Sequence, residues 1–175
     1  LILIKQQWEA KELEASIERL EKSCNSAGIE FFVGISDGRA GLNGVSELFC
    51  QARAALLNAE TDGCRIKEYK EIGLDKLICS ADSQALQSFV WHTVGEIRSY
   101  DEKNGTELLN LLRYYIENNG SISSIAQRLG VHRNTVNYQL GRVKELFGFT
   151  LDETKKAELT LAFRILKLNE KGNLL

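Results

Sequence analysis

The sequence contains no proline in its 175 residues, although average usage of about 5% would give roughly nine. Proline breaks helix interiors, so its absence is typical of a mostly helical chain. Methionine is absent too, so either the chain starts downstream of its natural initiator or a modified methionine is missing from the sequence. A mostly helical fragment is expected.

Long apolar runs are absent as well. No stretch approaches the roughly 20 apolar residues that a membrane-spanning helix needs. The N-terminal LILIK is followed at once by an acidic helical pattern, which differs from a signal peptide. With a hydrophobic content of 43% and a charged content of 26%, these features predict a cytoplasmic globular protein without membrane contact.

Metal-binding and redox motifs are also lacking. The four cysteines are widely spaced and never form a C-x-x-C pair: Cys24, Cys50, Cys64 and Cys79. Only His92 and His132 could join them, so we expect no metal site and no cofactor. Free, buried thiols in a reducing cytoplasm are the better interpretation.

An excess of positive charge is absent from the chain as a whole, whose formal net charge is −2. The two parts of the chain differ, however. Residues 103–175 hold 11 Lys/Arg and 7 Asp/Glu, a net of +4, whereas residues 1–102 hold 11 and 17, a net of −6. A basic C-terminal part is what a phosphate-binding module requires.

The first part of the chain alternates predicted strands and helices. Residues 1–5 and 30–36 (EFFVGIS) have the apolar composition of strands, and residues 64–69 alternate like an edge strand. Apolar residues at helical spacing predict helices over residues 8–25 and 45–59. This order predicts an α/β layer in which helices cover a sheet.

The middle of the chain predicts a helix followed by a linker. Residues 72–79 have the pattern of a short apolar connection, and residues 82–100 that of an amphipathic helix. The polar stretch YDEKNG at residues 100–105 is the expected domain boundary. A last helix over residues 152–168 is apolar on more than one face, so we expect it to pack between domains or between subunits.

Residues 121–147 have the spacing of a helix-turn-helix. A short helix is predicted to end at Gly130, after which Val131 should point back into the core. The second helix has an apolar stripe formed by Val136, Leu140, Val143 and Phe147. Side chains that can bond base edges and phosphates lie on its opposite face, which carries Asn134, Asn137, Tyr138, Gly141 and Arg142. The pattern predicts that this helix binds DNA.

The C-terminal part also resembles a known family. Residues 107–153, ELLNLLRYYIENNGSISSIAQRLGVHRNTVNYQLGRVKELFGFTLDE, are similar throughout to the C-terminal helix-turn-helix of PucR/CdaR-type transcription regulators. The V-H-R-N-T-V segment, Tyr138 and the final L-A-F-R-I-L helix carry this resemblance. It implies a bacterial regulator that binds DNA through this domain and senses an effector through a domain absent from this chain. The family usually has basic residues at the positions of Asn137, Gln139 and Gly141, so weaker binding or an unusual operator is expected.

A looser resemblance concerns the first part. QARAALLNAETDGCRI, residues 51–66, and the VGIS before it resemble the closing helix, glycine and strand of the GGDEF domain. The resemblance implies a degenerate GGDEF-like domain without its first half. That half would carry the carboxylates that hold the metal of a cyclase, so we expect no catalytic residues and no enzyme.

These observations predict an α+β fold in three parts. Residues 1–79 would be a partial GGDEF-like α/β sandwich, residues 80–104 a connecting helix and linker, and residues 105–175 an all-α helix-turn-helix domain. The expected function is a DNA-binding transcriptional regulator that reads the major groove with the helix from about Arg133 to Phe147. The expected DNA contacts are Ser121, Ser123, His132, Arg133, Asn134, Thr135, Asn137, Tyr138 and Arg142.

Within that set the chemistry of the side chains separates two roles. Asn134 and Asn137 should contact bases, while Tyr138, Arg142 and a capping serine should serve phosphates. The alternative is a protein-interaction or dimerisation module without DNA binding, and a nucleotide cyclase is the least favoured.

Besides double-stranded DNA, the expected partner is a second copy of the chain. In a GGDEF-type core, the strands at residues 1–5 and 30–36 would flank a strand of the missing half, and their unpaired edges would need new partners. Helix-turn-helix proteins also commonly bind as two-fold dimers that read half-sites about 34 Å apart. Both arguments favour a homodimer.

Overall fold

The computed structural model describes residues 10–37, 44–172 and 174–175. The chain divides into two compact units, Leu1–Cys79 and Ser80–Leu175, and its described residues are mostly helical. The strand predicted at residues 1–5 lies outside the described residues.

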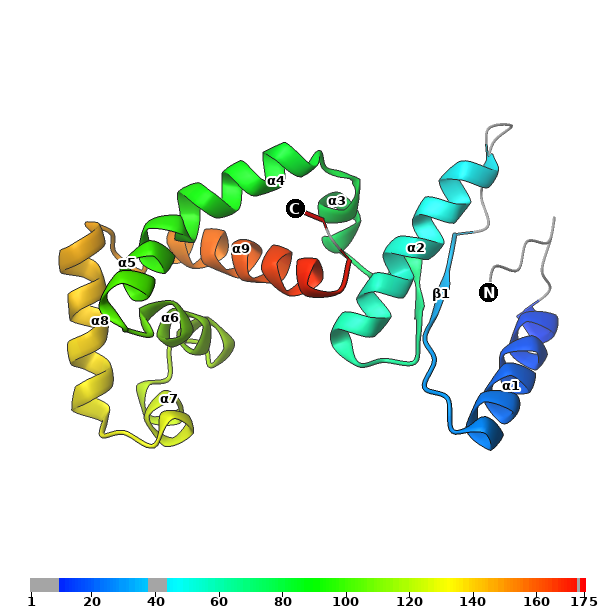
Figure 1. Ribbon diagram of the computed structural model, residues 1–175, viewed down its shortest axis with the longest axis horizontal. Coiled ribbons are helices and arrows are strands. Elements are labelled where there is room, and N and C mark those ends of the chain that lie inside the picture. Colours follow the sequence, from blue (N-terminus) through cyan, green and yellow to red (C-terminus); the bar gives the residue numbers. More distant parts are fainter. Residues whose placement is uncertain (1–9, 38–43, 173) are drawn as a thin grey trace. The chain divides into compact units, whose positions relative to one another are not determined.

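The first unit holds a small sheet covered by one helix. β1 (Val33–Ile35) and β2 (Ile66–Glu68) pair in parallel, with Val33 opposite Ile66. α2 (Gly44–Asp62) connects them and packs on β1 (Figure 1). Parallel strands require such a crossover, because a tight hairpin can join only antiparallel ones. Of the predicted α/β sandwich, the described residues therefore contain one β-α-β unit with a two-stranded sheet.

The close approach of α2 to β1 depends on Gly34. A Cβ atom here would lie 2.1 Å from the carbonyl oxygen of Ala52 and 2.3 Å from the backbone nitrogen of Leu56. Both are backbone atoms of the helix and cannot rotate away as a side chain would. The glycine in EFFVGIS therefore sets the distance between strand and helix.

The remaining elements of the first unit are short or lightly packed. α1 (Ala10–Ala27) has no fully buried residue over positions 11–27. After β2 come a 3-10 turn, η1 (Tyr69–Glu71), and the short helix α3 (Asp75–Ser80). The prediction of a plain connection at residues 72–79 was therefore wrong, because a six-residue helix is too short to show a helical period.

The four cysteines are outside disulfides, and they are not buried. Cys50 and Cys64 are exposed, and Cys24 and Cys79 are partly exposed. Cys64 follows Gly63, which ends α2 in a left-handed conformation (φ 68°), so the thiol lies on a surface turn. The prediction of buried thiols was wrong.

In the second unit the helix α6 (Leu108–Glu117) lies at the centre of the packing. α4 (Ser83–Val90), the π-helical segment η2 (Trp91–Gly95) and α5 (Glu96–Asn104) follow one another without a break. α6 (Leu108–Glu117) packs against α5 and against three later helices: α7 (Ile122–Leu129), α8 (Arg133–Phe147) and α9 (Glu153–Gly172). The helical C-terminal part of the predicted fold is confirmed.

The apolar last helix uses both of its faces within this unit. α9 packs against α6 on one side and against α4 and η2 on the other (Figure 1). Its buried side chains are Leu159, Ala162, Phe163, Ile165, Leu166 and Leu168. The excess of apolar residues in α9 is accounted for by these two contacts.

The stretch YDEKNG forms a tight corner between α5 and α6. Gly105 ends α5 with φ 62°, and the Asp101 carboxylate accepts hydrogen bonds from the backbone N–H groups of Leu108 and Leu109 at 2.9 and 2.8 Å. The polar residues of this stretch thus cap the start of α6. Division of the chain at residues 79 and 104 stays a prediction.

Candidate nucleic-acid interface

α7 and the turn that follows it make the first half of the helix-turn-helix. The hydroxyl of Ser121 caps α7 by accepting a hydrogen bond from the N–H of Ser124 at 3.4 Å. Gly130 ends the helix in the left-handed conformation, with φ 66°. Because L side chains rarely adopt this conformation, glycine is the residue that allows so sharp a turn.

Val131 was expected in the core, but its side chain is 39% exposed. What closes the turn is the backbone of this residue, since its N–H donates to the Ala126 carbonyl at 3.0 Å. Its side chain is left on the surface beside the turn. The prediction that it points inward was wrong.

A small buried core holds α7 and α8 against α6. Its buried members are Leu111, Ile125, Ala126 and Val136. Ile125 and Val136 are fully buried, and burying such a side chain stabilises the fold by about 1.5–3 kcal/mol. Because Val136 faces this core, the opposite side of α8 must face away from it.

His132 caps the start of α8. Its Nδ1 accepts a hydrogen bond from the N–H of Asn134 at 3.2 Å. A ring nitrogen that accepts carries no proton, so Nε2 of the neutral ring is left as a donor. The capping role of His132 was missed in the sequence, because the usual signal for a capping residue is Ser, Thr, Asp or Asn.

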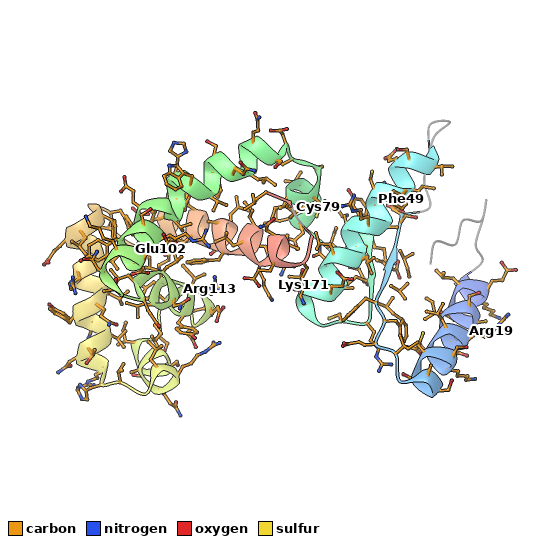
Figure 2. All side chains as sticks on the ribbon, viewed as in Figure 1. Arg19, Phe49, Cys79, Glu102, Arg113 and Lys171 are labelled. Carbon is orange, nitrogen blue, oxygen red and sulfur yellow. The ribbon has the colours of Figure 1, made fainter. Side chains whose placement is uncertain are left out.

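The outward face of α8 presents most of the predicted contact residues together. Side chains project from the side of α8 that faces away from α6 and α7 (Figure 2). The exposed members are Arg133, Asn134, Thr135, Asn137 and Tyr138, and Tyr138 is 67% exposed. Ser121 and Ser123 are exposed at the start of α7. The structure thus offers two amides, a phenol and a guanidinium along the first half of one helix, all groups that can bond bases or phosphates.

Arg142 is placed differently from the other predicted residues. It is partly buried, and its Nη2 donates a hydrogen bond to the Tyr100 hydroxyl of α5 at 2.8 Å. The phenol ring of Tyr100 also meets the ring of Phe147 edge-on, with centroids 5.7 Å apart. Arg142 therefore lies on the flank of α8 that faces α5.

Other charges around α8 are partly neutralised. Arg128 of α7 pairs with Glu117 at 3.0 Å and lies over the ring of Tyr114, 4.4 Å from its centroid.

Lys144 is exposed on α8 and was not among the predicted contacts. Its position seven residues after Asn137 places both on one side of the helix, so helical spacing alone could have found it.

The described residues meet the requirements of neither a metal site nor a membrane-spanning helix. Across residues 10–37, 44–172 and 174–175, no three His, Cys, Asp or Glu side chains lie close enough to hold a metal ion. In the same ranges no helix is long and apolar enough to cross a bilayer.

Comparison with known families separates this helix-turn-helix from other three-helix modules. Residues 108–165 match the PucR C-terminal helix-turn-helix domain. The C-terminal domain is of the PucR type. The match runs from the first residue of α6 into α9. These two helices pack against each other.

Two relatives of this chain come from Bacillus subtilis (strain 168). One is the proline-responsive transcriptional activator PutR, 23% identical over 141 residues, which are 78% of this chain and 34% of the relative. The other is the purine catabolism regulatory protein, 31% identical over 138 residues, which are 77% of this chain and 26% of the relative. No solved structure matches the chain.

These comparisons support a DNA-binding transcription regulator and homology to PucR-type regulators. The chain spans about a third and about a quarter of the length of the two curated relatives. One relative is named as a transcriptional activator and the other as a regulatory protein, which accords with the expectation of a non-enzyme. Neither the family match nor the relatives support the GGDEF-like origin of the first unit.

Proposed function

We propose that this chain is part of a bacterial, cytoplasmic transcription regulator that binds duplex DNA with α8 in the major groove. The observation that carries the proposal is the outward face of α8, where two exposed asparagines lie in a PucR-type helix-turn-helix. An α-helix fits the major groove, and an asparagine amide can bond adenine through two adjacent groups.

The contacts fall into two classes. Asn134 and Asn137 contact bases. Tyr138, Arg133 and Lys144 contact phosphates, because their hydrogen-bond donors are exposed and phosphates are the same in every DNA sequence. Ser121 and Ser123, at the start of α7, and the Nε2–H of His132 add further donors beside the DNA backbone.

The test starts from a duplex enriched by the chain from a random library, together with a scrambled duplex of the same composition. Affinity for both is measured by fluorescence anisotropy over a range of salt concentrations. We expect the enriched duplex to bind more tightly, and affinity for both to fall linearly on a log–log plot as salt rises. A chain that enriches no duplex and shows no salt-dependent binding would instead be a protein-interaction module.

Substitution of Asn137 separates base reading from phosphate attraction. Asn137→Ala should lose about 1–3 kcal/mol of discrimination at one base pair while the salt slope stays unchanged. Asn110→Ala is the matched control, because Asn110 is also exposed on a helix of this unit but lies on α6. Unchanged preference in Asn137→Ala would show that another face of α8 meets the DNA.

We further propose that the regulator acts as a homodimer and that its effector binds outside this chain. Two-fold helix-turn-helix dimers read paired half-sites about one helical turn apart. Light scattering behind size-exclusion chromatography would report the dimer at tens of micromolar, and the enriched duplex should contain an inverted repeat. A monomer that enriches an unrepeated site would contradict this arrangement.

A further inference from the structure

Two neighbouring residues at the end of α5 attach this helix to the helix-turn-helix. The Tyr100 hydroxyl accepts a hydrogen bond from Arg142 of α8, and the Tyr100 ring packs edge-on against Phe147. The Asp101 carboxylate accepts hydrogen bonds from the first two N–H groups of α6 and from the hydroxyl of Thr106. One turn of α5 is thus bonded to both α6 and α8.

These attachments come from outside the matched domain. The PucR-type match covers residues 108–165, whereas Tyr100 and Asp101 precede it. Within the match, the core cluster joins α7 to α6 and to Val136, in the first half of α8. Tyr100 meets α8 at Arg142 and Phe147, in the second half of that helix. The core and Tyr100 therefore hold α8 at two separate places along its length.

We propose that Tyr100 and Arg142 are positioning residues that set the orientation of α8 toward DNA, and that Arg142 acts through Tyr100 and not as a phosphate contact. This inference rests on the proposed function, since it concerns how the same helix meets its operator. Arg142 is partly buried on the flank toward α5, so part of its guanidinium is already used within the protein.

The orientation of α8 matters more for base contacts than for phosphate contacts. A hydrogen bond to a base edge weakens steeply when its angle falls, so a small rotation of α8 would misalign Asn134 and Asn137. Long cationic side chains reach phosphates from many orientations, and their attraction depends on charge more than on direction. Loss of the Tyr100–Arg142 bond should therefore lower specific binding and leave non-specific binding nearly unchanged.

The experiment uses the whole chain, the enriched duplex and the scrambled duplex. Tyr100→Phe removes only the hydroxyl and keeps the ring on Phe147, so the fold should remain intact. We expect it to weaken binding to the enriched duplex about three- to tenfold, the range of one net hydrogen bond, with the scrambled duplex affected less than twofold. The salt slope should not change, because no charge is removed.

Four further variants complete the test. Arg142→Ala should weaken specific binding by a similar factor, and adding Tyr100→Phe to it should bring little further loss, because both remove the same bond. Tyr69→Phe and Arg53→Ala are matched controls, since both residues lie in the first unit. Far-UV circular dichroism of each variant reports whether the overall helix content is retained.

Two outcomes would overturn the inference while leaving the proposed function standing. In the first, Tyr100→Phe binds the enriched duplex like the unchanged chain, while Arg142→Ala weakens both duplexes alike and lowers the salt slope by about one, as for a phosphate contact. In the second, the losses in the two single variants add fully in the double variant. Failure of the unchanged chain to bind any duplex would instead overturn the proposed function.

Discussion

Gly130 and Gly141 offer the same substitution in two different backbone conformations. At neither position would a Cβ atom meet another heavy atom within 4 Å, so steric crowding is removed from the comparison. Gly141 lies inside α8, whereas Gly130 ends α7 in the left-handed region with φ 66°. Replacing each by alanine therefore measures the backbone alone.

The two substitutions should have opposite signs. Alanine is better than glycine by about 0.8–1.0 kcal/mol in a helix interior, so Gly141→Ala should stabilise the second unit by about that amount. A left-handed conformation costs an L residue roughly 1–2 kcal/mol, so Gly130→Ala should destabilise the unit. For a domain of this size, 1 kcal/mol shifts the melting temperature by about 4–8 °C. Gly141→Ala should then melt about 3–8 °C higher, and Gly130→Ala lower.

Thermal unfolding followed by far-UV circular dichroism measures both shifts. A Gly141→Ala chain that melts at or below the unchanged chain would contradict a regular helix through position 141. A Gly130→Ala chain that melts as high as the unchanged chain would contradict the left-handed turn. Binding of the enriched duplex adds a second measurement, because a Gly141→Ala chain that is more stable yet binds more weakly would place the bare backbone of α8 against the groove.

Substitutions at His132, Asp101 and Ile125, with comparison variants, test the contacts that hold the helix-turn-helix together. His132→Ala should cost about 0.5–2 kcal/mol through loss of the α8 cap, whereas His132→Asn should melt close to the unchanged chain. Asp101→Ala should cost about 1.5–3 kcal/mol, since it removes charge-assisted bonds to α6, and should speed hydrogen exchange at the Leu108 and Leu109 amides. Ile125→Ala should cost about 2–5 kcal/mol in denaturant unfolding, more than Ile122→Ala, because Ile125 is fully buried and Ile122 is not.

The helix-turn-helix was predictable because its signals are local. The apolar spacing, Gly130 and the capping serine are all read within one or two turns of the chain, and α7 and α8 formed where they predicted. α1, α2 and the strands around Val33 and Ile66 were predicted for the same reason. The errors in elements and burial were of two kinds: α3 is too short to show a period, and the exposure of Val131 and of the cysteines depends on packing.

The sequence by itself determined the elements of the C-terminal domain and the outward face of α8, because a helix repeats every 3.6 residues and a face follows from that repeat. It did not determine where Arg142 points. Tyr100 is 42 residues away along the chain, and only the packing of α5 beside α8 brings its hydroxyl to the guanidinium. The tertiary structure alone therefore decided that this polar residue of α8 is bonded within the protein, since long-range contacts leave no periodic trace in the sequence.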